Sequence, residues 1–282
     1  NLHIGHYFGS LQNRVRLAIH GVIVKKDGTC VEVCVGEEDD DPVFCITDLL
    51  IHLSSKQMEK TGAKVIEGEQ LDVVVGSIPL SDSEKNCVKE NVLNILKKEY
   101  DIEEEDFVSA ELEVVPAGKA RELGFDRGMI MSYGQDDRVC AYTALKSILD
   151  CTSVKKTAVT ILTDKEEIGS DGNTGLCSEY LKHFFYNLSD CFGANGRKVI
   201  ANTECLSADV NAAFDPTFPD VMDKRNCAFM NYGVCVTKYT GARGKSGTSD
   251  ASAEFVGRVR SLLDGNNVIW QTGELGKVDA GG

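Results

Sequence analysis

One short segment constrains the fold more than any other. Residues 157–163 read Thr-Ala-Val-Thr-Ile-Leu-Thr, an unbroken run of apolar and β-branched side chains. Such a run is typical of a strand that is covered on both faces, as in parallel sheets with helices on either side. We therefore expect a buried strand here, within a sheet that helices cover.

The residues around this segment alternate between helix-like and strand-like patterns. The apolar spacing predicts helices over 136–149, 175–185 and 249–263, and strands over 198–202, 232–238 and 267–271. The last helix has a serine ahead of it and Gly265 after it, which are common boundary signals. The alternation predicts an α/β architecture with a mostly parallel sheet.

The first part of the chain follows a different pattern. Residues 20–26 and 30–35 flank Asp27-Gly28, a dipeptide that favours a tight hairpin turn. Further strands are predicted over 42–46, 71–75 and 107–115, and a helix ending near Tyr100 follows a capping-box pattern at residues 81–84. A length of 282 residues favours about two domains. We place them at 1–118, which is β-rich, and 119–282, which is α/β.

Excess negative charge is concentrated in the first domain. Residues 1–118 hold 23 of the 44 acidic side chains but 11 of the 30 basic ones, with dense runs at 37–41 and 103–106. The net charge of −14 argues against a nucleic-acid binder, because such proteins need a basic face. We interpret the runs as a solvated loop and a turn beside a helix. Binding of a metal ion or a basic partner is the alternative.

Membrane and redox signals point to the cytoplasm. The sequence has no stretch of about 20 apolar residues, so we expect no membrane-spanning segment. None of its eleven cysteines forms a CxxC pair or a zinc-finger pattern. Most stand in apolar runs, as Cys30, Cys34, Cys140 and Cys235 do. We expect these to behave as small hydrophobic side chains in a reducing compartment.

Acidic residues occur at three places where the predicted sheet would present its edge. Asp136 and Asp137 begin a helix, Glu166-Glu167 follows the strand over 157–163, and Asp209 lies just past the strand over 198–202. Ligands of open α/β sheets collect beyond the carboxyl ends of strands. Carboxylates gathered there repel one another unless a cation or proton joins them. A pair of divalent metal ions would use such a group.

Each of these signals also has a plainer interpretation. Paired glutamates are common on exposed turns, and an Asp-Arg pair such as Asp137-Arg138 can simply suit the start of a helix. Asp209 can be a helix cap. The three places gain weight together, because all of them fall at strand ends of one inferred sheet.

Six motifs in order give the chain a recognisable signature: GQDDR, DKEEIGS, SADVNAAFDP, KRNCAFMNYG, TKYTGARGKSG and WQTGELGKVDAGG. Their combination resembles the aspartyl aminopeptidase and vacuolar aminopeptidase I family of dinuclear zinc metalloaminopeptidases. The resemblance implies that Asp136 bridges two divalent metal ions, that Glu167 binds one of them and that Asp209 binds the other. It implies that Glu166 is the general base. The ions implied are zinc, with cobalt or manganese as alternatives.

The resemblance also implies what the two domains do. Members of the family insert a β-rich dimerisation domain into a zinc-exopeptidase catalytic domain, and their dimers assemble into dodecamers. Residues 1–118 correspond to the insert and 119–282 to the catalytic domain, incomplete at both ends. A histidine of the insert contacts substrate in a neighbouring subunit, a role that falls on His52. Lys238 resembles a substrate-pocket residue. Without the resemblance, both would be interpreted as ordinary surface or packed side chains.

Two metal ligands of the family pattern do not appear in the chain. Both are histidines, one in an HxD motif before the insert and one in a motif beyond the glycine-rich stretch. Neither His3 nor His6 is followed by an aspartate two residues later, and the chain stops inside the glycine-rich stretch. The chain therefore supplies three of the five ligands. We expect it to be an incomplete view of a larger enzyme.

The main hypothesis is a metalloaminopeptidase that hydrolyses the N-terminal residue from peptides. In it, metal ions activate a water molecule, and Glu166 takes its proton and passes it to the leaving amine. The missing histidines motivate the alternative of a non-catalytic assembly or binding protein on the same scaffold. A two-carboxylate glycosidase is disfavoured, because the chain has a single Trp and no sugar-stacking cluster.

Overall fold

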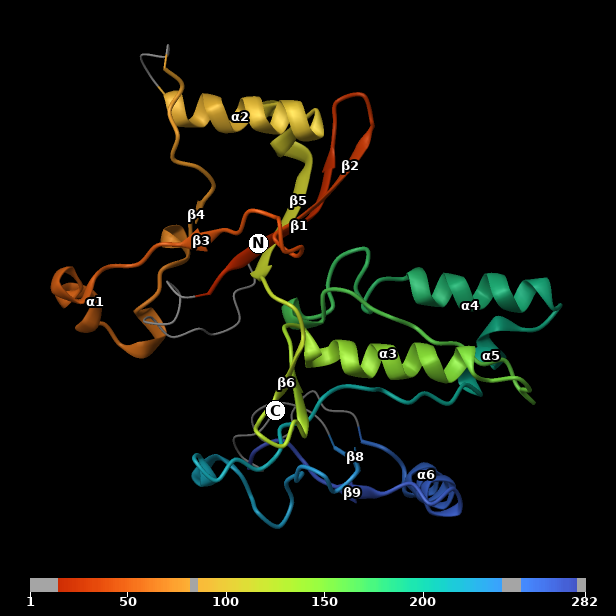
Figure 1. Ribbon diagram of the computed structural model, residues 1–282. Helices are drawn as coiled ribbons and strands as arrows, with labels where there is room; N and C mark the ends of the chain where they lie inside the picture. Colours follow the sequence, from red (N-terminus) through yellow and green to blue (C-terminus); the bar gives the residue numbers. More distant parts are fainter. Residues whose placement is uncertain (1–14, 82–85, 240–249, 278–282) are drawn as a thin grey trace. The chain divides into compact units, whose positions relative to one another are not determined.

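The computed structural model describes residues 15–81, 86–239 and 250–277 (Figure 1). The chain divides into two compact units, Asn1–Gln135 and Asp136–Gly282. Each unit combines helices and strands, so the protein is of mixed α/β class. The domain boundary predicted after residue 118 remains a prediction.

The first unit is built on a three-stranded antiparallel sheet. Its strands are β1 (Leu17–Val24), β2 (Cys30–Val35) and β5 (Ala110–Pro116), in the order β2-β1-β5. The hairpin predicted around Asp27-Gly28 is confirmed, with the Thr29 amide donating to Asp27 Oδ1 over 2.9 Å. Ala18 and Ile23 of the central strand are almost fully buried. The sheet therefore holds part of the apolar core of this unit.

Close packing in this sheet requires a glycine at the middle of β1. Gly21 pairs with Val33 on one side and with Leu112 on the other, and its φ is +143°. A Cβ atom built at this position would lie 2.0 Å from the carbonyl oxygen of Glu111. Only a residue without a side chain fits such an approach of two backbones.

The remaining elements of the first unit are short except for one helix. They are β3 (Cys45–Ile46), η2 (Ile51–Leu53), α1 (Ser55–Met58), η3 (Gly62–Lys64), η4 (Gly68–Gln70), β4 (Val73–Val74), α2 (Cys87–Tyr100), η5 (Glu104–Ser109), β6 (Arg121–Leu123) and β7 (Met129–Met131). β3 pairs with β4 and β6 with β7, both antiparallel. The strands predicted over 42–46 and 71–75 are confirmed as short pairs, and the helix predicted to end near Tyr100 is α2. Most of the predicted capping box at 81–84 lies outside the described residues.

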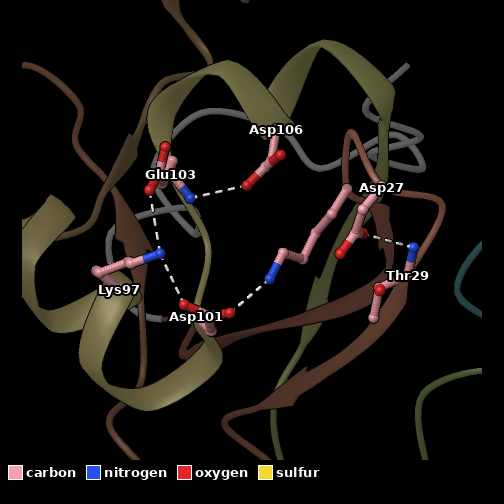
Figure 2. Close-up of polar contacts among 7 residues, drawn as sticks. Asp27, Thr29, Lys97, Asp101, Glu103 and Asp106 are labelled. Atoms are coloured by element: carbon pink, nitrogen blue, oxygen red, sulfur yellow. Dashed lines mark hydrogen bonds and ion pairs between the residues drawn. The ribbon is translucent and has the colours of Figure 1, made fainter.

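A network of ion pairs closes the end of α2 against the sheet (Figure 2). Asp101 accepts from Lys25 Nζ at 2.6 Å and from Lys97 Nζ at 2.7 Å, and Lys97 also reaches Glu103 at 3.0 Å. These bonds lower the pKa of Asp101 to about 2, and the two carboxylates raise the pKa of Lys97 to about 12. The network thus joins the turn between β1 and β2, helix α2 and the turn that follows α2.

Both acidic runs have structural partners within the first unit. In residues 103–106, the Glu103 amide donates to Asp106 Oδ2 at 2.9 Å as part of a capping box for η5. In residues 37–41, Asp41 Oδ2 accepts from the amides of Gly36 and Glu38, and these bonds lower the pKa of Asp41. These contacts agree with the interpretation of the runs as a loop and a turn beside a helix.

The second unit carries more helix than strand. Its elements are α3 (Gln135–Leu149), η6 (Glu166–Ile168), α4 (Tyr180–Cys191), α5 (Gly196–Ala201), η7 (Pro219–Val221), β8 (Val234–Val236), α6 (Ala253–Gly265) and β9 (Trp270–Thr272). β8 and β9 pair in parallel, and α6 lies between them in the chain (Figure 1). The strands predicted over 232–238 and 267–271 and the last helix are therefore confirmed, with shifted bounds.

Two strand predictions in the second unit are wrong. Residues 198–202 lie mostly in helix α5, which begins where the Asn195 side chain accepts from the Lys198 amide at 3.0 Å. This cap satisfies an amide that a strand would have had to pair elsewhere. Residues 157–163 form no strand in the described structure, although Asp164 bridges Gly175 in parallel directly afterwards. The helix predicted over 175–185 begins later, as α4.

The cysteines differ from their predicted environment. All eleven are free thiols, and each lies among the described residues. Cys30 and Cys34 are exposed on β2 rather than packed, whereas Cys227 is buried. Within the described ranges, every helix is too short or too polar to cross a bilayer.

Candidate metal centre

Asp136 and Asp137 lie where the chain enters α3. Neither has helical backbone angles, with φ −88° and ψ 107° at Asp136 and φ −115° and ψ 31° at Asp137, and the peptide bond between them is cis. The regular helix therefore begins after them, so two carboxylates stand at its positively polarised end. Both residues are exposed to solvent.

Cys140, one turn further along α3, lies near carboxylates from two segments. Burial raises the pKa of the Cys140 thiol, and the negative charges of Asp137, Asp209 and Asp136 raise it further. Asp209, far along the chain from α3, is thus one of the charges that act on Cys140. Two of the predicted metal ligands, Asp136 and Asp209, thus lie near the same thiol.

The predicted pair Glu166 and Glu167 occupies a tightly closed turn. Both belong to η6, which is preceded by Lys165 in the left-handed region at φ 67°. The Ser170 amide donates to the Lys165 carbonyl at 2.8 Å, and the Gly169 amide donates to the Glu166 carbonyl at 2.9 Å. Glu166 is exposed. The side chain of Glu167 lies outside the described atoms.

Asp209 lies in an irregular segment, and hydrogen bonds hold the residues that follow it. Its Oδ1 accepts from the Val210 amide at 2.7 Å. Two residues later, Asn211 Nδ2 donates to Cys235 Sγ of β8 at 3.3 Å. The Phe214 amide donates to the Ala228 carbonyl at 2.8 Å. These bonds tie the Asp209 segment to β8 and to the chain before it.

Lys238 stands two residues beyond the end of β8 and is already paired. Its Nζ forms an ion pair with Asp250 and lies 4.3 Å from the centre of the Tyr239 ring. The hydrogen bond to Asp250 raises the pKa of Lys238, so its side chain is a cation at neutral pH. Its predicted contact with substrate remains a prediction.

His52 belongs to the first unit, whereas the carboxylates belong to the second. It is exposed in the short helix η2, between Leu50 and Leu53, which are 67% and 69% exposed. An exposed histidine flanked by exposed leucines is available to another chain. Its predicted place in a neighbouring subunit's site remains a prediction.

The donor chemistry suits a divalent metal only in part. Asp136 and Asp209 offer carboxylate oxygens near the same thiol, and such oxygens are metal ligands. Within the described residues, however, no three His, Cys, Asp or Glu side chains come close enough together to hold an ion. The side chain of Glu167, the third predicted ligand, lies outside the described part of the structure. The described residues therefore supply a pair of donors rather than a closed site.

Three neighbours of this region were not predicted as site residues. Cys140 had only a weak signal, because it is close in sequence to Asp136 and Asp137 but the regular helix begins after those two residues. Asn211 and Gln271 had none, since each acts through hydrogen bonds to residues distant in sequence. Pairings of that kind do not follow from spacing.

The sequence of this chain is similar to those of a known protein family. The family model described as "Aminopeptidase I zinc metalloprotease (M18)" matches residues 11–282. The chain is 54% identical to "Probable M18 family aminopeptidase 1" of Clostridium acetobutylicum and 49% identical to that of Thermotoga maritima. These alignments cover 98% of the chain and 62% and 63% of the two relatives. The chain belongs to the M18 family of zinc metalloprotease aminopeptidases, as its six motifs predicted.

Solved structures agree with the sequence comparison. A crystal structure of the M18 aminopeptidase of Thermotoga maritima matches with a TM-score of 0.89 at 47% identity, over 98% of this chain and 63% of that one. Aminopeptidase I of Clostridium acetobutylicum matches with a TM-score of 0.87 at 55% identity, over 98% and 62%. The mApe1 dodecamer of Saccharomyces cerevisiae, at 20% identity, a TM-score of 0.58 and 98% and 61% coverage, shares the fold. The chain thus spans somewhat less than two thirds of its relatives.

Proposed function

We propose that this chain forms part of a metalloaminopeptidase that removes the N-terminal residue from peptides. The supporting observation is the match of residues 11–282 to a zinc metalloprotease family, in a chain where the charges of Asp136 and Asp209 act on the same thiol. Paired carboxylates at the start of a helix, together with the charge of a carboxylate from another segment, suit a positively charged ligand. Membership of an aminopeptidase family supplies the class of reaction.

The carboxylates of this chain would hold two zinc ions together with residues that it does not include. Asp136 would contact both ions, and Glu167 and Asp209 would contact one each. When bound, such a pair of ions acidifies a water molecule and polarises the carbonyl of the scissile bond. The residue roles rest on the motif resemblance, and the placement of Asp136 and Asp209 supports them.

Glu166 is the proposed general base. It is exposed on a turn fixed by two backbone hydrogen bonds, so its carboxylate is presented to solvent from a defined position. In this role Glu166 takes a proton from the attacking water and gives it to the nitrogen of the leaving amine. The role proposed for Lys238, contact with substrate, rests on the motif resemblance.

Replacing Glu166 tests the proposal. Glu166→Gln keeps the size of the side chain and removes the base, so kcat should fall by about 10²–10⁴-fold while zinc content stays unchanged. The matched control is Glu179→Gln, an exposed glutamate before α4 that pairs with Lys182 at 2.7 Å. It should keep the kcat of the unsubstituted protein. Peptidase assays and metal analysis of the complete protein provide both readouts.

Two results would overturn parts of this proposal. A nearly normal kcat in Glu166→Gln would exclude Glu166 as the base. An unsubstituted protein without bound metal and without peptidase activity would instead favour a non-catalytic assembly protein on the same scaffold. About two zinc ions per chain would support the dinuclear site.

The first unit is proposed to serve assembly in the cytoplasm. We propose that the β-rich residues 1–118 are an inserted dimerisation domain, that dimers build a dodecamer, and that His52 reaches a neighbouring subunit's substrate. The exposed leucines around His52 support a contact between chains, because apolar side chains gain free energy when a partner covers them. Eleven free thiols, seven of them exposed, favour a reducing compartment.

A further inference from the structure

The side chain of Gln271 uses every polar group it has on one loop. Its Oε1 accepts from the Phe229 amide at 2.9 Å, and its Nε2 donates to the carbonyls of Phe229 at 3.0 Å and Gly233 at 3.1 Å. An amide side chain offers two donors and one acceptor, and here all are engaged. Gln271 therefore clamps residues 229–233 at both ends.

The clamp is anchored on the parallel strand pair of the second unit. Gln271 stands in β9 opposite Cys235 of β8. At the start of β8, Gly233 has φ +87°, and a Cβ there would lie 2.0 Å from the Ile269 carbonyl oxygen. The two backbones thus meet closely where the clamped loop ends. The position of the loop is therefore set by β9.

The clamped loop packs in turn against the segment that follows Asp209. The rings of Phe229 and Phe214 lie 5.6 Å apart, Ala228 bridges Ala213, and the Phe214 amide donates to the Ala228 carbonyl. Ala228 is 6% exposed, so this contact is one of the buried places of the chain.

A second connection reaches the same segment through β8. Asn211 donates to Cys235, the register partner of Gln271. The segment after Asp209 is thus held at residue 211 by β8 and at residues 213–214 by the loop that Gln271 clamps. Both connections end on the β8–β9 pair.

We propose that Gln271 is a positioning residue for Asp209. It holds residues 229–233, and through them the segment that follows Asp209, against the β8–β9 pair. This inference rests on the proposed function for its effect on metal binding. Residues that orient metal ligands from behind typically change metal affinity by about 10–100-fold when they are replaced.

The test compares Gln271→Met with the unsubstituted complete protein. Methionine keeps the length of the side chain and removes all three hydrogen bonds. We expect the Kd for Zn²⁺, measured by competition with a chelator, to rise by about 10–100-fold. The absorption spectrum of the Co²⁺-loaded protein should change, because it reports ligand geometry. The Phe214 amide should exchange its hydrogen faster, because Ala228 is no longer held.

A matched control separates this effect from a general loss of stability. Gln70→Met makes the same substitution at an exposed glutamine in the first unit and should leave all three readouts unchanged. An unchanged Kd, Co²⁺ spectrum and Phe214 exchange rate in Gln271→Met would overturn the proposal, even if Tm fell. An unsubstituted protein that binds no metal would contradict the proposed function. The exchange rate of Phe214 would then still decide whether Gln271 holds the Asp209 segment.

Discussion

Asp101 shows how much a single surface residue can connect. It ends α2 in the left-handed conformation, at φ 55°, and its carboxylate joins Lys25 of the β1–β2 turn to Lys97 of the helix. Its hydrogen bonds to these lysines lower its pKa from 3.8 to about 2. A carboxyl group with a lowered pKa in the folded protein stabilises that protein above its ordinary pKa. The contribution is lost as the pH falls toward about 2.

Asp101→Asn should therefore lower the stability of the first unit in a pH-dependent way. Asparagine tolerates the left-handed backbone, so the substitution removes the charge and little else. The variant should unfold at a lower urea concentration than the unsubstituted protein at pH 6. The gap between the two midpoints should narrow between pH 4 and pH 2, as Asp101 takes up a proton in the unsubstituted protein. Urea titrations across this pH range, followed by circular dichroism, measure it.

Asp72→Asn provides the comparison, because Asp72 is an exposed acid of the same unit. Its midpoint should follow that of the unsubstituted protein at every pH. If the gap for Asp101→Asn stayed constant down to pH 2, the ion pairs with Lys25 and Lys97 would not be its source.

The sequence predicted some site residues and gave no sign of others. Asp136, Glu166 and Asp209 stood out because they are acidic residues in motifs to which a family resemblance gave roles; the strands predicted before Glu166 and Asp209 are absent from the described structure. Gln271 and Asn211 did not, because a neutral amide becomes informative only when its partners are known. Their partners are backbone groups and a thiol brought close by tertiary packing.

At the scale of elements, β1 is the strand on which the first unit depends. It pairs on both sides, and its middle residue is Gly21, where the β5 backbone approaches too closely for any side chain. The predicted hairpin captured one of these pairings. The other joins residues far apart in sequence and had no local signal.

Gly21→Ala should destabilise the first unit. The added methyl group meets the Glu111 carbonyl and the backbone keeps a φ that alanine disfavours, so unfolding should become easier by about 1–3 kcal/mol. Gly68→Ala is the matched control, because an added Cβ there meets no atom within 4 Å. Urea unfolding of both variants measures the difference in their free energies of unfolding. Equal urea midpoints for the two variants would mean that the sheet accommodates a methyl group at residue 21 with no loss of stability.

Predictions of helices and strands failed where contacts with distant residues decide which of the two a segment forms. The turn at Asp27-Gly28 carries its own conformational preference, so the hairpin was predictable. Residues 198–202 contain Val and Ile, which favour strands, but the Asn195 cap makes the segment helical. Residues 157–163 have strand composition, yet a strand needs neighbours for its backbone groups, and the described residues provide none there.

At the scale of the whole molecule, charge is distributed unevenly along the chain. Most of the net charge of −14 comes from residues 1–118. Much of that charge is engaged in local caps and ion pairs, such as those of Asp41 and Asp101. The acidity therefore says more about how the first unit is built than about the proposed peptide substrates.

Mixing two inactive variants tests the proposed assembly. Glu166→Gln lacks the base, and His52→Ala lacks the group proposed to serve a neighbouring subunit. If His52 acts across an interface, mixed oligomers contain sites that combine Glu166 of one chain with His52 of another. Activity should then return when the variants are dissociated and reassembled together. Each variant reassembled alone is the control: an active His52→Ala protein would place His52 outside the reaction. Mixtures that stay inactive would place His52 in its own chain's site.

The strand order β2-β1-β5 has a consequence during synthesis on the ribosome. β1 finds β2 within a few residues, but its other edge waits for β5, since Ile23 pairs with Ala110. At about 5–20 residues per second, that wait lasts roughly 4–17 s. Throughout it, one edge of a nascent hairpin offers unpaired amides and carbonyls to any neighbouring chain. On crowded polysomes, the fidelity of this fold therefore depends on how well that open edge is shielded before residue 110 emerges.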